Sequence, residues 1–366
     1  MSGRRVRATT PVGILRGESS HVKLIIQIPC LDEERTLPRT LAELPRRVKG
    51  FDEVELLVVD DGSSDRTAEV ARAHGVDHVV RLAGNRGLAA AFQAGLDAAL
   101  KLGADAIVNT DADSQYRGAD VPLLVAPILA GEADMVVGDR DVNANAHFSA
   151  RKRRLARLGS WIVRRASATT VADPTCGFRA YNREAAIQTQ VVSTFTYTLE
   201  TVIQAGKTDL AIQHVPVRTN AETRPSRLFP SLWTYVRRNG LSIFRVYAHY
   251  EPLRVFWGAA VVVGLVALAI WGRFLYFFLV DGNGRGHVQS LILGAVLLNA
   301  AMLLAALGVI GDLLYAQRVL TQRTLDRMRR VELQLGVAPS HYEHAAPNGD
   351  GAGEAARGRE DGAPVL

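Results

Sequence analysis

Two long stretches without a charged residue restrict what this chain can fold into more than any other feature. They are Val255–Gly272 and Val288–Gly311. As a helix rising about 1.5 Å per residue, the first would be about 27 Å long, close to the thickness of a bilayer core. The short polar segment 281–287 separates the two, which predicts an antiparallel hairpin. A pair of helices buried in a soluble core is the alternative, but such helices usually carry a polar stripe, and these do not.

Arginines gather on both outer flanks of this hairpin. The loop side has only Arg273 and Arg285, whereas the flanks hold Arg237, Arg238, Arg245, Arg254, Arg318, Arg323, Arg327, Arg329 and Arg330. Because positive residues stay on the cytoplasmic side of a membrane, both flanks are expected there. The sequence therefore predicts a cell-membrane protein with two spans, within residues 253–317, and with its other parts in the cytoplasm.

The segments around the hairpin differ in composition. Residues 231–252 mix aromatic residues and arginine at helical spacing, which favours an amphipathic helix in the membrane interface over an ordinary core helix. Residues 318–336 are expected to form a cytoplasmic helix. The basic arm 1–20 has no apolar signal segment, and the tail 337–366 has few large apolar residues, so both are expected to lack order.

Residues 21–230 alternate between strand and helix patterns. Four continuous apolar runs predict buried parallel strands, and the segments 67–74 and 87–100 predict helices between them. The predicted strands are Val22–Pro29, Val54–Asp60, Ala106–Thr110 and Asp134–Gly138. This alternation indicates an α/β domain with a mostly parallel, Rossmann-like sheet, whose ligands bind at the carboxyl ends of the strands.

Acidic residues follow three of these strands. They occur in the segments 29–34 (PCLDEE), 60–65 (DDGSSD) and 111–115 (DADSQ). Since the strand ends lie side by side, one cleft is expected to hold several carboxylates, which need a cation or hydrogen-bond donors beside them. Helix capping could account for Ser63, Ser64 or Asp65, but it does not require both Asp60 and Asp61.

The third segment is the best candidate for a metal site. A tight turn after the strand could bring Asp111 and Asp113 to one ion, and carboxylate oxygens suit Mg²⁺ or Mn²⁺. A solvated acidic loop is the alternative for so short a motif. Cys30 and Cys176, the only cysteines, form neither a disulfide framework nor a zinc motif.

Six motifs in a fixed order give a more specific signal. After the three acidic segments and Asn85-Arg-Gly87 come Gly138-Asp-Arg140 and the segment 173–184 (DPTCGFRAYNRE). Over about residues 22–230 the chain resembles the family 2 glycosyltransferases of the GT-A fold. It is most similar to their dolichyl-phosphate mannose synthase and bacterial polyprenyl-phosphate glycosyltransferase branch.

The resemblance implies a role for each motif. Pro29, Glu33, Asp60 and Asp61 would line the nucleotide pocket. Asp111, Asp113 and Gln115 would hold the metal and the diphosphate, and Asp113 and Arg140 would be the catalytic residues. The segment from Asp173 to Arg179 would lie beside the acceptor site, and the acceptor phosphate would be held by Arg140, Arg153, Arg154, Arg179 and Arg227.

The implied reaction is inverting transfer of one sugar from a nucleotide-sugar to a polyprenyl phosphate. The net charge of +6 agrees with anionic partners, and no nucleic acid is expected. A homo-oligomer stays open. Other readings are a different membrane-associated acceptor, a nucleotidyltransferase and a non-enzymatic scaffold with this fold. A processive polysaccharide synthase would carry a Q-x-x-R-W segment and more spans, and neither is present.

Overall fold

A computed structural model describes most of the chain. It covers residues 21–140, 169, 171–191, 197–208, 210–220, 248, 250–281 and 288–344. The expected arm 1–20, nearly all of the expected interface helix 231–252, and the end of the tail beyond residue 344 lie outside these described residues.

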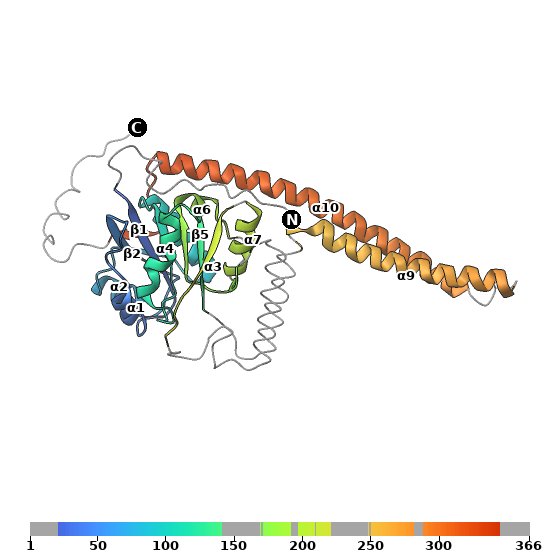
Figure 1. Ribbon diagram of the computed structural model, residues 1–366, viewed down its shortest axis with the longest axis horizontal. Coiled ribbons are helices and arrows are strands. Elements are labelled where there is room, and N and C mark those ends of the chain that lie inside the picture. The colour runs from blue at the N-terminus through green and yellow to red at the C-terminus, as the bar shows by residue number, and fades with distance from the viewer. Residues whose placement is uncertain are drawn as a thin grey trace, which may run out of the picture.

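One mixed sheet organises the described part of residues 21–220 (Figure 1). The strand order is β7-β5-β6-β4-β1-β2-β3-β8. The four neighbouring strands β4, β1, β2 and β3 are parallel to one another, and so are β5 and β7. Strands β6 and β8 run antiparallel to their neighbours. The strands are β1 Lys23–Cys30, β2 Glu53–Asp60, β3 His78–Arg81, β4 Ala106–Asn109, β5 Met135–Asp139, β6 Arg179–Asn182, β7 Ile212–Pro216 and β8 Tyr342–His344.

Helices cover the sheet, which explains why its central strands are continuous apolar runs. Seven of the eight residues of β1 are buried, because side chains on both faces of a covered sheet are removed from water. The helices are α1 Leu37–Glu43, α2 Thr67–Ala73, α3 Leu88–Lys101, α4 Val121–Leu129, α6 Arg183–Gln188 and α7 Thr198–Lys207. The predicted α/β fold with a mostly parallel sheet is confirmed.

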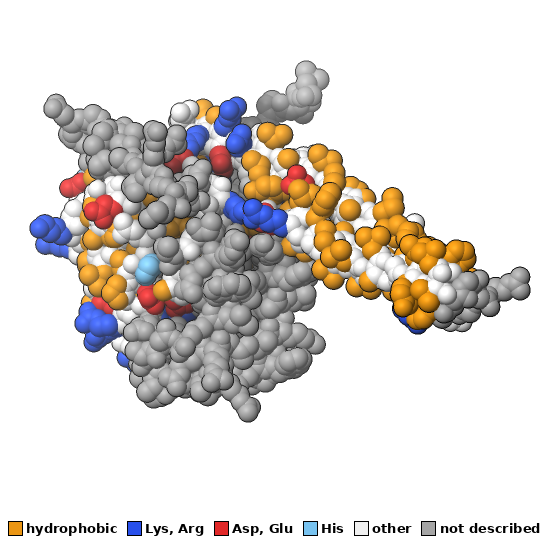
Figure 2. Space-filling model, turned by 45° about the vertical axis from the view of Figure 1, so that its right-hand side comes forward, with side chains coloured by type: hydrophobic (Ala, Val, Ile, Leu, Met, Phe, Trp, Pro, Cys, Tyr) orange, Lys and Arg blue, Asp and Glu red, His pale blue; other side chains and the backbone are white. Residues whose placement is uncertain are grey.

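Helices α9 (Pro252–Asp281) and α10 (Val288–Gln334) project away from the sheet and lie along each other (Figure 1). Both are long and apolar enough to cross a membrane, judged by length and composition. Only 11% and 17% of their most apolar windows are buried, and Figure 2 shows apolar side chains over their surface. This exposure does not fit the alternative of two helices buried in a soluble core.

Helix α10 runs without a break from the apolar segment to the α/β domain. The predicted boundary between a span ending at 317 and a separate helix 318–336 therefore falls inside one 47-residue helix. Its second half is held on the domain by Arg318, which pairs with Glu200 of α7, and by Arg329, which donates to the carbonyls of Ile187 and Thr189. Apolar hairpin and domain are thus joined by a continuous, packed element.

The prediction that disorder begins at residue 337 is wrong for the described part of the tail. Tyr342–His344 forms β8, which pairs antiparallel with β3. The Tyr342 hydroxyl lies 2.7 Å from His78 Nδ1, and Arg72 pairs with Glu343. The composition of a segment indicates only its average tendency to fold. Three residues of an otherwise polar segment can still form a strand when they pair with the exposed backbone groups of an edge strand.

Candidate active site

The three acidic segments meet at one edge of the sheet, as predicted. They follow β1, β2 and β4, which are neighbours in the order β4-β1-β2, and parallel strands end at the same edge. The first two segments are also interlocked. The backbone N–H of Asp32 donates to Ser63 Oγ at 3.0 Å, and that of Ser64 donates to Asp32 Oδ1 at 2.8 Å. The loops after β1 and β2 therefore form one connected wall.

The carboxylates at the end of β2, Asp60 and Asp61, hold the neighbouring loops. Asp60 Oδ1 accepts from the N–H of Ser63 at 2.8 Å, and Asp60 Oδ2 lies 3.2 Å from Arg81 Nε. Both oxygens of Asp61 accept backbone bonds of 2.8 Å, from Arg86 and Gly87. The motif Asn85-Arg-Gly87 is thereby fastened to the end of β2, which explains why the two motifs occur together.

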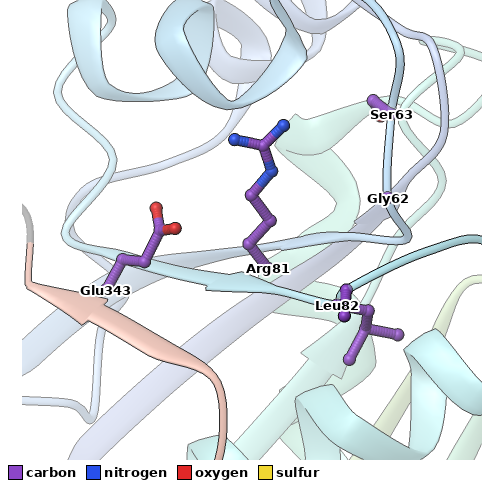
Figure 3. Close-up of a pocket in the computed structure, with 6 residues that line it drawn as sticks. Gly62, Ser63, Arg81, Leu82 and Glu343 are labelled. Carbon is purple, nitrogen blue, oxygen red and sulfur yellow. The ribbon is translucent and has the colours of Figure 1, made fainter.

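A cavity of about 370 Å³ lies beside these carboxylates (Figure 3). Its lining consists of Gly62, Ser63, Arg81, Leu82, Ala83 and Glu343. Gly62 has a φ of +73°, and a Cβ there would come within 2.5 Å of the Gly84 backbone, so only glycine lets the two loops approach. That Pro29, Glu33, Asp60 and Asp61 line a nucleotide pocket stays a prediction. In the structure Pro29 is buried within β1, and Glu33 accepts from the Thr36 hydroxyl.

The turn after β4 is built to hold two carboxylates. Asp113 Oδ1 accepts from the N–H of Gln115 at 3.0 Å. Directly after Asp113, Ser114 has a φ of 57° and places its hydroxyl 2.8 Å from that of Thr40. Burial, and then the charge of Asp113, raises the pKa of Asp111 to about 7. The turn thus holds the carboxyl groups of Asp111 and Asp113 near each other, where burial limits the ability of water to screen their repulsion.

These residues fit a divalent cation. The carboxylates of Asp111 and Asp113 and the amide of Gln115 belong to one turn, and burial together with the charge of Asp113 raises the pKa of Asp111. Oxygen ligands of this kind suit Mg²⁺ or Mn²⁺. Within the described ranges, no group of three or more His, Cys, Asp or Glu is arranged to hold a metal ion. The predicted metal site on Asp111, Asp113 and Gln115 therefore stays a prediction.

The raised pKa of Asp111 leads to a stability prediction. Since it lies above the ordinary value of 3.8, the carboxyl favours folding below about pH 4, and this contribution is lost as the pH rises through about 7. In EDTA, Asp111→Asn should therefore raise the unfolding temperature at pH 8 and have little effect at pH 4. Thermal unfolding at both pH values measures this, and equal effects at the two would contradict the assigned cause.

The segment before β6 lies directly over Asp111. A Cβ on Gly177 would come 3.0 and 3.1 Å from the two Asp111 oxygens, so the glycine allows the backbone to pack closely against the carboxylate. Its backbone is held on both sides, since its N–H donates to the Tyr116 hydroxyl at 3.0 Å and its carbonyl accepts from Asn109 Nδ2 at 2.9 Å. Asn109 Nδ2 also donates to the Tyr197 hydroxyl at 2.8 Å.

Sequence reasoning missed Asn109, Tyr116 and Tyr197. The sequence held a signal for Asn109, which is a polar residue at the end of an apolar run that predicts a buried strand. The structure buries its amide fully, and such a group needs hydrogen-bond partners. Gln27 of β1 continues the same network and donates to Asn109 Oδ1 at 2.8 Å. These groups fix the position of the segment above the acidic turn.

The prediction that Arg179 binds the acceptor phosphate is wrong for this structure. Its side chain is fully buried and is committed to protein acceptors. It donates to the carbonyls of Cys176 at 2.7 Å and Pro174 at 2.8 Å, and to Thr201 Oγ1 at 2.6 Å. Arg179 ties the 173–179 segment to α7, and an anion could reach it only if these bonds broke.

Arg140 follows β5 and faces Asp173. Its Nε and Nη2 donate to the two carboxylate oxygens at 2.6 and 3.1 Å, and Nη2 also donates to Thr175 Oγ1. Burial would raise the pKa of Asp173, but Arg140 outweighs it and lowers that pKa. Strand β6 separates β5 from β4, so Arg140 does not come from the strand next to the acidic turn. Its role toward a phosphate stays a prediction. Arg153, Arg154 and Arg227 lie outside the described residues.

Comparisons with known proteins agree with these motifs. The model of the family described as "Glycosyl transferase family 2" matches residues 25–189. An uncharacterised protein of Methanocaldococcus jannaschii is 32% identical over 202 residues, which cover 54% of this chain and 81% of that protein. An uncharacterised glycosyltransferase of Mycobacterium tuberculosis is 33% identical over 186 residues, 50% of this chain and 78% of that protein.

Two further similarities are weaker. The undecaprenyl-phosphate 4-deoxy-4-formamido-L-arabinose transferase of Yersinia pestis is 30% identical over 202 residues, 52% of this chain and 59% of that protein. The crystal structure of glucosyl-3-phosphoglycerate synthase from Mycobacterium tuberculosis with phosphoglyceric acid has 22% identity and a TM-score of 0.48, covering 66% of this chain and 84% of that one.

The family match covers the acidic segments after β1, β2 and β4, the Gly177 segment and the strands that carry them. The mostly parallel mixed sheet is the predicted GT-A fold. Given this match, together with a glycosyltransferase relative of which the chain covers more than two thirds, the chain belongs to glycosyl transferase family 2.

Proposed function

We infer that this glycosyltransferase moves a single sugar, with inversion, from a nucleotide-sugar to a polyprenyl phosphate at the cytoplasmic face of a membrane. The observation that carries the proposal is the pairing of the acidic turn at the end of β4 with two exposed apolar helices in the same chain. Such helices would hold the enzyme at the surface where a lipid acceptor is found. The Yersinia pestis relative is named for transfer to undecaprenyl phosphate, which supports this class of acceptor.

The proposed reaction requires little proton transfer by protein side chains. A phosphate oxygen is already ionised at neutral pH, so the acceptor needs no strong general base. A divalent cation bound by Asp111, Asp113 and Gln115 would supply Lewis-acid charge for the diphosphate leaving group. The Gly177 backbone, held by Tyr116 and Asn109, lies so close to Asp111 that a side chain would not fit there, and it thereby forms a fixed wall beside this carboxylate.

Arg140 is proposed to grip the acceptor phosphate. Its Nε and Nη2 are occupied by Asp173, whereas its Nη1 donates no hydrogen bond to any described residue. Arg140→Ala should lower lipid-dependent turnover by about 30- to 1000-fold, since loss of such an ionic contact commonly removes about 2–4 kcal/mol from the transition state. Turnover against lipid concentration and nucleotide affinity are measured separately. A collapse of nucleotide affinity with unchanged lipid dependence would assign Arg140 to the donor instead.

The proposed topology places the α/β domain in the cytoplasm. Arg254 and Arg318 flank the apolar parts of α9 and α10 on the side of the domain, as the positive-inside rule requires. Protease added to sealed, right-side-out cells should leave this domain intact and should digest it once the cells are opened. Digestion in sealed cells would reverse the orientation.

The reaction is tested with membranes that contain the full chain. They are incubated with a panel of labelled nucleotide-sugars, with and without added polyprenyl phosphate, and the lipids are extracted. We expect label from one donor in the lipid fraction, dependent on the added lipid phosphate. Label in another membrane-associated product would favour a different acceptor, and no transfer from any donor would favour a non-enzymatic scaffold.

A further inference from the structure

Strand β8 adds a residue from the far end of the chain to the cavity beside β2 and β3. Glu343 lines this cavity together with Gly62, Ser63 and Arg81, all from the first quarter of the sequence (Figure 3). The chain reaches this position after α10, since only residues 335–341 separate that helix from β8. The same segment that leaves the apolar hairpin thus supplies one wall of the cavity.

The pairing with β3 fixes where Glu343 lies. Tyr342 is opposite Val80, Glu343 is opposite Val79, and the N–H of Arg81 donates to the His341 carbonyl at 3.1 Å. Glu343 and Arg81 are therefore diagonal neighbours on one face of the sheet. His341 has a φ of 58°, which is unusual for a residue other than glycine and persists only where the surroundings hold it. The turn that leads into β8 is held at the rim of the cavity.

The charges around the cavity differ from one side to the other. The guanidinium of Arg81 is partly balanced from inside by the fully buried Asp60, whose Oδ2 lies 3.2 Å from Arg81 Nε. Glu343 contacts Arg72 through Oε2, while Oε1 has no hydrogen bond or ion pair to the described residues. A carboxylate oxygen of this kind accepts hydrogen bonds from N–H and O–H groups and repels anions.

This pattern fits the nucleoside end of a nucleotide-sugar better than its diphosphate. A nucleoside offers base N–H groups and ribose hydroxyls, whereas a diphosphate offers only acceptors and negative charge. The sheet order β4-β1-β2-β3 also separates the cavity from the acidic turn after β4, the proposed diphosphate site. A donor lying across the strand ends would thus place its nucleoside by β3 and its diphosphate by β4.

We propose that β8 forms the outer wall of the donor nucleotide site and that Glu343 is a specificity-determining residue that accepts a hydrogen bond from the nucleoside. This inference rests on the proposed function, since it requires a nucleotide-sugar donor. It assigns the segment after the apolar hairpin a part in donor selection, in addition to its packing on the domain.

Binding of nucleoside diphosphates to the detergent-solubilised full chain tests this inference. Isothermal titration with a panel of bases, in Mn²⁺, compares the wild type with Glu343→Gln and Glu343→Ala. Both variants should weaken binding of the preferred nucleotide by about 10- to 150-fold, the size expected for one hydrogen bond to a charged group. A change in the order of preference among bases places the contact on the base, and an equal loss for all of them places it on the ribose.

Glu332→Gln is the matched control. Glu332 is also an acidic residue that follows the hairpin and forms an ion pair, with Lys101 Nζ at 3.4 Å, but it does not line the cavity. We expect this variant to bind nucleotide as the wild type does, and all variants to unfold at similar temperatures without nucleotide.

The outcomes separate the two proposals. Unchanged nucleotide affinity in both Glu343 variants, or an equal loss in Glu332→Gln, would overturn the role of Glu343 while a nucleotide-binding wild type still supports the proposed function. A wild-type protein that binds none of the nucleotides would instead refute the proposed donor class itself.

Discussion

Replacing Asp113 by Asn should lower sugar transfer by about 100- to 1000-fold or more while the protein stays folded. Removal of one charge from the pair with Asp111 weakens the hold on a divalent cation, and such an ion commonly contributes several kcal/mol to the transition state. The fold is expected to survive because the amide introduced by Asp113→Asn keeps an oxygen that can accept from the N–H of Gln115, the bond that shapes the turn. Asp113→Ala loses this acceptor and should also loosen the turn.

The measurement is initial transfer rate at saturating donor, with thermal unfolding as the check on folding. Asp97→Asn is the matched control, because Asp97 pairs with Lys101 where α3 meets α10 and takes no part in the acidic turn. Excess EDTA should reduce the wild type to the level of Asp113→Asn. Full activity of the wild type in EDTA would refute the cation, and full activity of Asp113→Asn would refute the role of this carboxylate.

Replacing Arg179 by Met should destabilise the protein by roughly 2–6 kcal/mol, a large part of the typical stability of a domain. The substitution leaves the carbonyls of Pro174 and Cys176 buried without their donor, and each such group costs about 1–3 kcal/mol. Arg179→Lys keeps the charge but cannot reproduce the planar set of donors, so it should fall between the wild type and Arg179→Met.

Denaturant unfolding of the solubilised full chain measures this loss. Arg330→Gln is the comparison, since Arg330 is half exposed and pairs with Glu184 on the surface, where an ion pair contributes about 1 kcal/mol or less. A stable Arg179→Met protein with a selective loss of lipid-dependent transfer would restore the phosphate-binding role that the structure argues against.

The acidic segments illustrate how much of the site was predictable. Asp111 and Asp113 could be placed at a strand end from the apolar run before them, and the parallel order of the strands brings them to the same edge as Asp60 and Asp61. Local patterns carry this information because burial on both faces of a strand, and its abrupt end in a turn, are written in neighbouring residues.

The roles of the arginines could not be read in the same way. Arg140 and Arg179 both belong to recognisable motifs, yet one faces Asp173 and the other is buried against backbone carbonyls. A guanidinium binds a phosphate, a carboxylate or a carbonyl with the same N–H groups. Which of these it meets depends on residues distant in the sequence, such as Thr201 for Arg179.

By itself the sequence determined the α/β class, the acidic strand ends and the two long apolar helices, because each depends on the periodicity or composition of a continuous segment. Only the tertiary structure decided that α10 runs unbroken onto the domain, that Asn109 and Tyr116 hold Gly177 above Asp111, and that β8 returns to β3. These features depend on contacts between segments as far apart as His78 and Tyr342. The physical reason is that hydrogen bonds and edge-strand pairing satisfy polar groups wherever the fold brings them together, whatever their separation along the chain.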